Sequence, residues 1–246
     1  GLRWYDFDED RVQIFVGIFA DPIDSTGSVQ ADGFAPRVIF SYDLSEATRL
    51  NAQVSKGFRL GGINDPLNIT LCSAEDVLIY GPFQSDSYND ETLWNYEAGV
   101  KYSRGPITFN AAAFYTDIKD LQVTVDAGSC SSRIVLNVEK AHTMGIEAEF
   151  TANPMPGLDL SFAGSIIEAE FDSTVDNAVL ASRTGIREGN RLPSVPKFQV
   201  AATATYSQRL NATADWYVNG SFQQVGNRYT QPGDQEPGNQ IFNSIF

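Results

Sequence analysis

The segment Ala47–Asn64, ATRLNAQVSKGFRLGGIN, alternates in side-chain type for almost a dozen residues and then ends in a glycine-containing polar loop. One set of alternate positions is apolar or small and the other is polar or small: Leu50, Ala52, Val54 and Phe58 against Arg49, Asn51, Gln53, Ser55 and Gly57. Successive side chains point to opposite faces only in a β-strand, so a period of two predicts a long strand with two different faces.

The same two-faced pattern recurs along the chain, in the segments that begin near Thr92, Ile107, Lys197 and Asn211. Tyr, Trp and Phe gather near the ends of these segments. One apolar face, one face that carries charges such as Glu97 and Lys101, and aromatic residues at the strand ends are typical of a transmembrane β-barrel with a watery or plugged interior. We therefore predict an all-β fold, an antiparallel meander of about nine or ten strands that forms part of a large barrel.

The connections between the expected strands alternate between short turns and long loops, as they do in outer-membrane barrels. The expected strands are Leu2–Asp8, Phe34–Tyr42, Thr48–Phe58, Thr92–Ser103, Ile107–Tyr115 with an extension through Leu121–Val125, Ile134–Thr151, Leu158–Phe171, Lys197–Tyr206 and Asn211–Gln223, while Val12–Phe19 is an apolar run of unassigned role. The expected loops are Asp21–Gly33, Arg59–Asp90, Gly128–Ser132, Asp172–Leu192 and Gly226–Asn239. Short turns are expected at Asp43–Ala47, Arg104–Pro106, Asn153–Gly157 and Ser207–Leu210.

The charge balance argues against nucleic-acid binding. Lys and Arg number 17 and Asp and Glu number 31, which gives a formal net charge of −14. Phosphate recognition needs clustered cations, which this balance does not favour. An acidic surface suits cationic partners, but solubility alone also accounts for it.

The sequence contains no apolar run of 18 or more residues, so we expect no transmembrane helix. The beginning, GLRWYDFDEDR, lacks the basic and apolar regions of a signal peptide and reads as a strand already under way. The end, NQIFNSIF, is equally abrupt. We therefore expect residues 1–246 to be part of a longer barrel, truncated at both ends.

Cys72 and Cys130 are the two cysteines, and their spacing fits no zinc motif. Both fall in expected loops at the same end of the sheet, separated by one down-and-up pair of strands. An even pair in the loops of an exported protein favours a disulfide, and two free thiols are the alternative.

The sequence offers little from which a catalytic site could be assembled, so we predict no enzyme, cofactor site or metal site. His142 is the one histidine, and we interpret it as a lumen or surface residue rather than a catalytic base. Glu147 and Glu149 share a strand face and are interpreted as a solvated lumen face rather than a catalytic carboxylate pair. The residues that contact a ligand stay unassigned.

Three further motifs have weak functional interpretations. Gly61-Gly62 is not followed by the Lys-Ser/Thr of a phosphate loop, so we read it as the place where a strand leaves the membrane. Asp86, Asp90 and Glu91 could offer oxygen ligands to Ca²⁺, but their spacing is not that of a calcium loop. Asn211-Ala212-Thr213 spells a glycosylation sequon, which we read as strand.

Six segments, taken in order, resemble the C-terminal part of the barrel of TonB-dependent outer-membrane receptors. They are VSKGFRLGGIN, DETLWNYEAGVKYS, FNAAAFYTDIKDLQ, NVEKAHTMGIEAEF, GLDLSFAGSIIEAEF and GNRLPSVPKFQVAATATYS, and they run from about residue 34 to residue 225. Leu60 stands where the family often has proline. The resemblance is nearest to siderophore receptors, and the N-terminal plug and TonB box of the family are absent from this sequence.

This resemblance implies an outer-membrane active-transport receptor of a Gram-negative bacterium. Its ligand would be a ferric siderophore or a similar nutrient complex, and its partners would be outer-membrane lipid and the TonB complex, acting through the missing plug. The alternatives are a passive outer-membrane channel and a soluble β-rich binding module. An upstream plug domain would favour the receptor, and extraction as a folded monomer without detergent would favour the soluble module.

Overall fold

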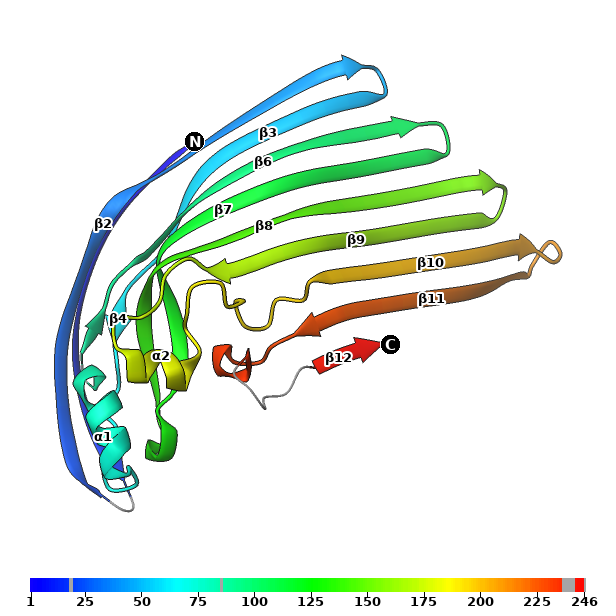
Figure 1. Cartoon of the computed structure of the whole chain (residues 1–246). Helices are drawn as coiled ribbons and strands as arrows, with labels where there is room; N and C mark the ends of the chain where they lie inside the picture. Colours follow the sequence, from blue (N-terminus) through cyan, green and yellow to red (C-terminus); the bar gives the residue numbers. More distant parts are fainter. Residues whose placement is uncertain (18–19, 85, 236–241, 246) are drawn as a thin grey trace.

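A single large antiparallel sheet dominates the structure (Figure 1). The computed structural model describes residues 1–17, 20–84, 86–235 and 242–245, and for residues 13, 15–17, 20–25 and 242–245 it describes the backbone alone. Within this part, ten strands lie in the order β1-β2-β3-β6-β7-β8-β9-β10-β11-β12. Each strand of this sheet therefore pairs with its neighbours in sequence, which confirms the predicted meander.

Apart from the short β12, the sheet strands are longer than typical strands of globular proteins. They are β1 (Leu2–Gly17), β2 (Ala20–Ser45), β3 (Thr48–Arg59), β6 (Glu91–Arg104), β7 (Ile107–Asp126), β8 (Arg133–Met155), β9 (Leu158–Phe171), β10 (Phe198–Arg209), β11 (Asp215–Arg228) and β12 (Phe242–Ile245). The connections carry a two-stranded sheet of β4 (Gly62–Ile63) and β5 (Ser87–Tyr88), the helices α1 (Ala74–Tyr80) and α2 (Ala178–Thr184), and the 3₁₀ turns η1 (Gly81–Phe83), η2 (Gly128–Cys130) and η3 (Pro232–Gln235).

The strand register sorts the side chains into the two predicted faces. Residues directly opposite each other in adjacent strands share a face, so a row of paired residues can be followed across the sheet. One row is apolar or small except for its last residue: Leu50, Val100, Ala111, Ala148, Gly164, Val200 and Gln224. The neighbouring row is polar or small except for its last residue: Asn51, Gly99, Ala112, Glu147, Ser165, Gln199 and Val225. We call the first face the outer face and the second the inner face.

Aromatic side chains lie at both margins of the apolar band on the outer face. Near the tight turns, Tyr102 pairs with Phe109, and Phe109 pairs with Phe150. Toward the other end, Tyr96 pairs with Tyr115. At about 3.3 Å per residue, the stretch from Tyr96 to Tyr102 spans about 20 Å, close to the apolar band of about 25 Å of an outer-membrane barrel.

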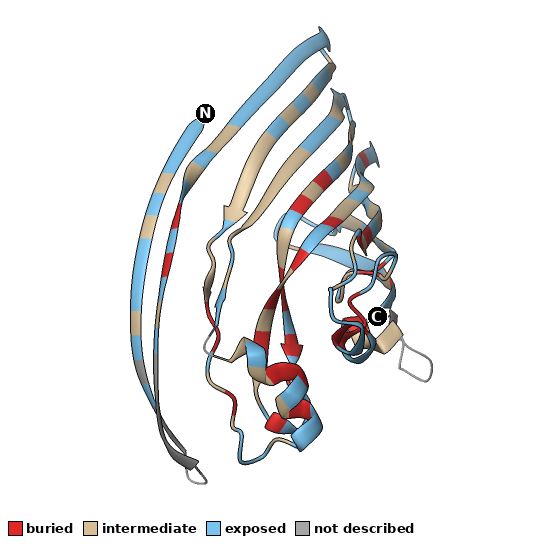
Figure 2. Cartoon of the chain, turned by 60° about the vertical axis from the view of Figure 1, so that its left-hand side comes forward, coloured by how far each residue is buried: buried red, intermediate tan, exposed pale blue. Residues whose placement is uncertain are grey.

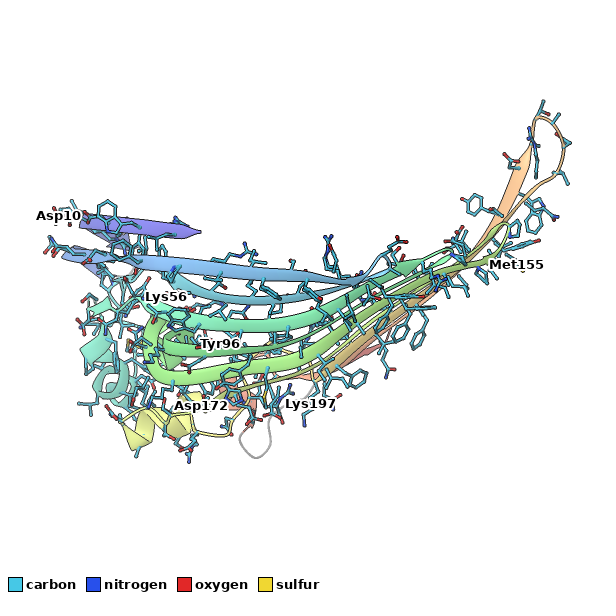
Figure 3. All side chains as sticks on the ribbon, turned by 90° about the horizontal axis from the view of Figure 1, so that it is seen from above. Asp10, Lys56, Tyr96, Met155, Asp172 and Lys197 are labelled. Atoms are coloured by element: carbon cyan, nitrogen blue, oxygen red, sulfur yellow. A yellow bond between two sulfur atoms is a disulfide. The ribbon has the colours of Figure 1, made fainter. Side chains whose placement is uncertain are left out.

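The two ends of the sheet differ, as the alternation of connections predicts. Tight turns join β2 to β3, β6 to β7 and β8 to β9 at one end, where Met155 is labelled in Figure 3. The structured connections lie at the other end, with Asp10 and Asp172. At the β8–β9 turn, Gly157 has φ +83°, and a Cβ there would lie 2.0 Å from the carbonyl oxygen of Ser207, so the turn needs glycine.

The loop expected at Asp21–Gly33 is wrong, because this segment belongs to β2. Its backbone pairs along β1 from Leu2 opposite Pro36 to Gly17 opposite Ala20. A Cβ on Gly27 would lie 2.8 Å from the side chain of Ile63, so the small residue makes room for the loop that covers this hairpin. The Asp, Ser and Gly residues of this segment therefore lie in a paired strand. Their small size suits the packing of the long connection against that strand. Val12 belongs to β1, while residues 18–19 of that apolar run lie outside the described part.

The last long hairpin also departs from expectation. β11 begins at Asp215 rather than Asn211, because the amides of Leu210 and Asn211 both bond to the carbonyl of Ala214 and close a turn. The side chain of Asn211 accepts a hydrogen bond from the amide of Thr213, which is the local bonding that favours turns. The sequon therefore lies in a turn, and its assignment to a strand was wrong.

The two long connections expected to be irregular each contain a short helix. Ser73 caps α1 by accepting a hydrogen bond from the amide of Asp76, and Asn177 caps α2 in the same way. Gly185 ends α2 in the left-handed conformation, which favours glycine. The helices in the described part of the chain are too short and too polar to cross a bilayer.

The buried core lies at the end of the sheet that carries these loops, and not between layers of the sheet (Figure 2). Its members come from the β7–β8 tip and from the connections around it, among them Leu67, Ile79, Val125, Ile134, Phe171, Leu180 and Ile186. Large apolar residues of the outer face, such as Phe40, Ile146 and Ile166, are at least 61% exposed in the isolated chain. An exposed apolar band of this extent needs lipid to cover it.

The neighbouring residues Ala112 and Ala113 offer a matched test of the two faces. Ala113 lies on the outer face between the aromatic margins, and Ala112 lies on the inner face. We expect Ala113→Arg to destabilise the inserted full-length protein by about 2–4 kcal/mol, because it places a cation near the bilayer midplane. Ala112→Arg should lower the free energy of unfolding clearly less. Urea unfolding in lipid vesicles measures the free energy of unfolding of both variants.

Spin labels extend the test to the whole sheet. Labels on the outer face at Leu50, Val54, Val100, Phe109, Val200 and Val218 should be relaxed by oxygen dissolved in lipid, and those at Asn51, Gln53, Glu97, Asn110 and Thr203 by a water-soluble agent. The reverse pattern would mean that the faces are exchanged.

Candidate functional site

The structured connections form one compact unit, which we call the loop cap: residues 60–90, the β7–β8 tip (121–138) and residues 172–192. Its sides are joined by hydrogen bonds from distant parts of the chain. Asn64 donates to the carbonyl of Val135 at 2.9 Å and accepts from the amide of Val135 at 2.7 Å. The side-chain amide of Gln122 donates to the carbonyls of Leu60 and Asn89 at 2.9 and 3.1 Å. These contacts fix the long connection onto the β7–β8 hairpin.

Cys72 and Cys130 are joined in the loop cap by a disulfide with a sulfur–sulfur distance of 2.14 Å. Cys130 is fully buried in the cap core, and Cys72 packs against that core. The bond links the segment just before α1 to η2 at the tip of the β7–β8 hairpin. It therefore ties the long connection between β3 and β6 to the protruding β7–β8 hairpin, and we propose that the exported protein carries this bond.

Asp76 is the polar centre of the cap. Its Oδ2 accepts hydrogen bonds from the Ser73 hydroxyl at 2.9 Å, from the Ser129 amide at 2.9 Å and from the Ser129 hydroxyl. The bonds from Ser129 are the first cause of a pKa of Asp76 below the ordinary carboxyl value, because they stabilise its ionised form. The preceding residue, Glu75, pairs with Arg183 of α2 and so links the two helices.

Sequence reasoning missed this polar cluster, although a signal for it was present. Ser73-Ala-Glu-Asp76 has the Ser-x-x-acid spacing of a helix start. The expected loop Arg59–Asp90 hides this signal, because the helix that follows spans only Ala74–Tyr80 and shows no periodic pattern. The contribution of Ser129, from a segment far away in sequence, has no local signature.

The inner face forms the second part of the candidate site. A shallow hollow of about 310 Å³ is lined by polar side chains around a floor of small residues. The polar residues are Asn51, Glu97, Lys101, Asn110, Glu147 and Glu149, and the floor includes Gly99 and Ala112. Glu147 and Glu149 therefore lie on the inner face, as interpreted from the sequence. Small residues under long polar ones allow water or a polar protein surface to approach the sheet closely.

His142 lies at the margin of the outer face and not in the inner hollow. Its Nδ1 is 2.7 Å from a carboxylate oxygen of Asp172, and its Nε2 is 3.7 Å from Glu168. Both ring nitrogens thus face carboxylates rather than a hydroxyl or thiol nucleophile. The residue links β8 to the start of the connection that carries α2.

The carboxylates weighed as a calcium site are bonded to the protein instead. Asp90 accepts from the Gly61 amide at 2.6 Å, Glu91 from the Gln122 amide at 2.9 Å, and Asp86 from the Ser87 amide at 2.9 Å. Within the described ranges, no group of three His, Cys, Asp or Glu side chains is arranged to hold a metal ion. Gly61 and Gly62 lie where the chain leaves β3, with the backbone carbonyl of Tyr88 against Gly61.

Comparison with known proteins identifies the family. The family model described as "TonB dependent receptor-like, beta-barrel" matches residues 1–245. The chain belongs to this family. TonB-dependent receptors are non-enzymatic transporters of the Gram-negative outer membrane, so the predicted fold, location and absence of enzymatic activity follow from membership.

Similar proteins are receptors and transporters with different cargoes. The pesticin receptors of Yersinia enterocolitica and Yersinia pestis are 24% identical over 198 residues, which cover 80% of this chain and 26% of theirs. The ferric yersiniabactin uptake receptor FyuA from Yersinia pestis superposes with a TM-score of 0.67 at 22% identity, over 91% of this chain and 30% of that one. Copper transporter OprC gives 0.66 at 14% identity, over 100% and 35%. At these identities the structures support the fold alone.

The chain spans about a quarter of the length of the curated relatives it matches. Membership of the family establishes the barrel fold and the outer-membrane location, but it does not identify the ligand of the whole protein.

The disulfide can be tested directly on protein isolated from outer membranes without reductant. We expect a non-reduced digest to contain the Cys72 and Cys130 peptides joined. The bond should stabilise the folded cap by about 2–4 kcal/mol, because it lowers the conformational entropy of the unfolded loop. A Cys72→Ser/Cys130→Ser variant should therefore exchange amide hydrogens faster in residues 62–90, with little change in β10 and β11. Two separately alkylated peptides from the native protein would contradict the bond.

The ionisation of Asp76 should control the order of the cap. Because its folded pKa lies below the ordinary value of about 3.9, its stabilisation is complete above that value and is lost as the pH falls through the folded pKa. We expect exchange of the Ser129 amide, corrected for intrinsic rates, to accelerate across this acidic window. Asp76→Asn should remove the pH dependence, and Glu75→Gln serves as the exposed control. An unchanged profile in Asp76→Asn would exclude this role.

Proposed function

We propose that this chain is part of an outer-membrane receptor that takes up a ferric siderophore or a similar nutrient complex. In this proposal the extracellular end captures the ligand, and a TonB partner supplies the energy through a plug domain of the full-length protein. Residues 1–246 would then be one section of a larger barrel, whose remaining strands pair with the free edges of β1 and β12. The names of the relatives support an iron chelate, since several are ferric-siderophore receptors.

The observation that carries the proposal is the difference between the two ends of the sheet. One end has tight turns, and the other has a cap with its own buried core, a disulfide and a buried carboxylate network. Packed and cross-linked loops suit a receptor, because ordering the loops before binding lowers the entropic cost of capturing a ligand.

The polar inner face supports the same function. Carboxylates, amides and a lysine above a floor of small residues suit an interior filled by a polar, water-bearing domain. The soluble binding module weighed from the sequence is set aside, because the family is located in the outer membrane. A passive channel stays as the outcome that the experiment must distinguish.

A gene deletion under iron restriction tests the proposal. The strain that lacks the full-length gene should fail to grow on at least one ferric siderophore in a panel, and a plasmid copy should restore growth. A strain without TonB should show the same failure, because outer-membrane uptake of the chelate would depend on energy. Growth on that siderophore without TonB would indicate a passive channel, and growth of the deletion strain on every iron source would exclude ferric siderophore uptake as its function.

A further inference from the structure

The loop cap covers the inner face where the sheet meets the long connections. On β9, counting in steps of two from Ser165 of the inner face leads to Phe171, which is buried. Phe171 belongs to the same core cluster as Leu180 and Ile186 of the connection that follows β9. Ala141, directly opposite Phe171 on β8, is fully buried as well. At this end of the sheet the cap therefore lies over the inner face.

The tip of the β7–β8 hairpin joins the same cluster with the opposite set of residues. Ile146 of β8 is exposed on the outer face, where it pairs with Ala113. Counting in steps of two from Ile146 leads to Val138 and Ile134, and both are buried in the cap core. Every second residue of a regular strand stays on one face. The strand pair must therefore turn over between the membrane band and its tip.

The pairing of the hairpin is broken at Asp120. β7 and β8 pair on both sides of Asp120 and Glu139, which do not pair with each other. Asp120 has φ +54°, and among the strand residues that the structure describes it is the one non-glycine residue in the left-handed region. Asp and Asn adopt this conformation more readily than other residues with a Cβ. The break therefore carries a residue type that suits an abrupt change of strand direction.

Hydrogen bonds from distant segments hold the break in place. The side-chain amide of Asn137 donates to the carbonyl of Asp120 at 2.8 Å and to the carbonyl of Asn89 at 3.0 Å. Its side-chain oxygen accepts from the Asn89 amide at 2.6 Å. The backbone amide of Gln122, two residues beyond the break, donates to the carboxylate of Glu91 at 2.9 Å. The segment that enters β6 thus fixes the shape of the hairpin at this point.

We propose that Asp120 is an elbow that seats the loop cap over the inner face. Its left-handed backbone turns the hairpin tip, so that apolar residues in series with the lipid-facing row join the cap core instead. A residue that prefers extended backbone would favour a straighter hairpin and would release the cap from the inner face. This conformational device does not depend on which solute the full-length protein carries.

The reactivity of a buried thiol tests the elbow in the full-length protein in lipid vesicles. The reporter is Ala141→Cys beneath the cap, and the probe is a charged, water-soluble maleimide, whose labelling rate follows the population with a released cap. The cost of left-handed backbone for a β-branched residue predicts that Asp120→Val speeds labelling about 5- to 30-fold. Asp120→Asn removes the charge but keeps the backbone preference, so it should label at the rate of the parent protein.

Two controls separate movement of the cap from other effects. Glu139→Val makes a similar change on the opposite strand, where the backbone is not left-handed, and should leave the labelling rate unchanged. Hydrogen exchange of residues 126–133 at the hairpin tip should also stay unchanged in Asp120→Val, because the disulfide and the Asp76 hydrogen bonds keep the cap folded. Protein without the reporter cysteine gives the background labelling.

The folded state of each variant is checked by its heat-modifiable mobility on a gel. A folded Asp120→Val that labels at the parent rate would overturn the elbow, as would an Asp120→Asn or Glu139→Val that labels as fast as Asp120→Val. Faster exchange at the tip would also overturn it, because the cap would then have unfolded rather than moved. Where Asp120→Val does not fold, Asn137→Ala removes the bond to the Asp120 carbonyl and should speed labelling roughly two- to tenfold. An unchanged rate in that variant would count equally against the elbow.

Discussion

Backbone hydrogen bonding between neighbouring strands is the constraint on which the rest of this structure depends. A chain that crosses lipid has no water to satisfy its amides and carbonyls, so each strand must pair along its length. The continuous pairing from β1 to β12 meets this requirement and fixes the register. Once the register is fixed, every side chain belongs to one of two faces, and the apolar band, the polar inner face and the aromatic margins follow from it.

The same pairing accounts for the position of the loop cap. β7 and β8 remain paired beyond the membrane band, from Leu121 opposite Val138 to Asp126 opposite Arg133. This protruding hairpin gives the long connection a surface to pack on, and the hydrophobic core cluster lies around it, at the loop end of the sheet (Figure 2). The cap is thus a small water-soluble core built on the end of a lipid-covered sheet. Its disulfide and the Asp76 cluster hold parts that no periodic pattern connects.

The separation of β3 from β2 shows how a local break in pairing brings side chains of different strands together. Where β2 and β3 part after Ser55, Arg3 of β1 lies over the ring of Phe58 of β3, and that ring stacks on Tyr5 of β1. No single strand carries this arrangement, so it belongs to the junction.

Much of the fold could be predicted from the sequence because a period of two is a local property. Segments such as Trp94–Ser103 and Ile107–Tyr115 show which side chains share a face, and the register confirms them. The strand assignment failed at Asp21–Gly33 and at Asn211, since polar and turn-forming residues look the same in an extended hairpin as in a loop. Only the partner strand or the turn bonds distinguish the two. For the candidate site, the sequence predicted a lumen face at Glu147 and Glu149, but it did not predict the Asp76 cluster.

The sequence by itself determined the strand pattern, the two faces, the alternation of turns and loops, and the family. Each of these depends on residues that are close together in the chain or on an ordered series of such segments. Tertiary structure alone decided that Ser129 bonds to Asp76, that Ile63 covers Gly27, and that Arg3 lies over the ring of Phe58. The physical reason is that these contacts join segments separated by tens of residues, and strand register and loop packing, rather than local side-chain preference, bring them within reach.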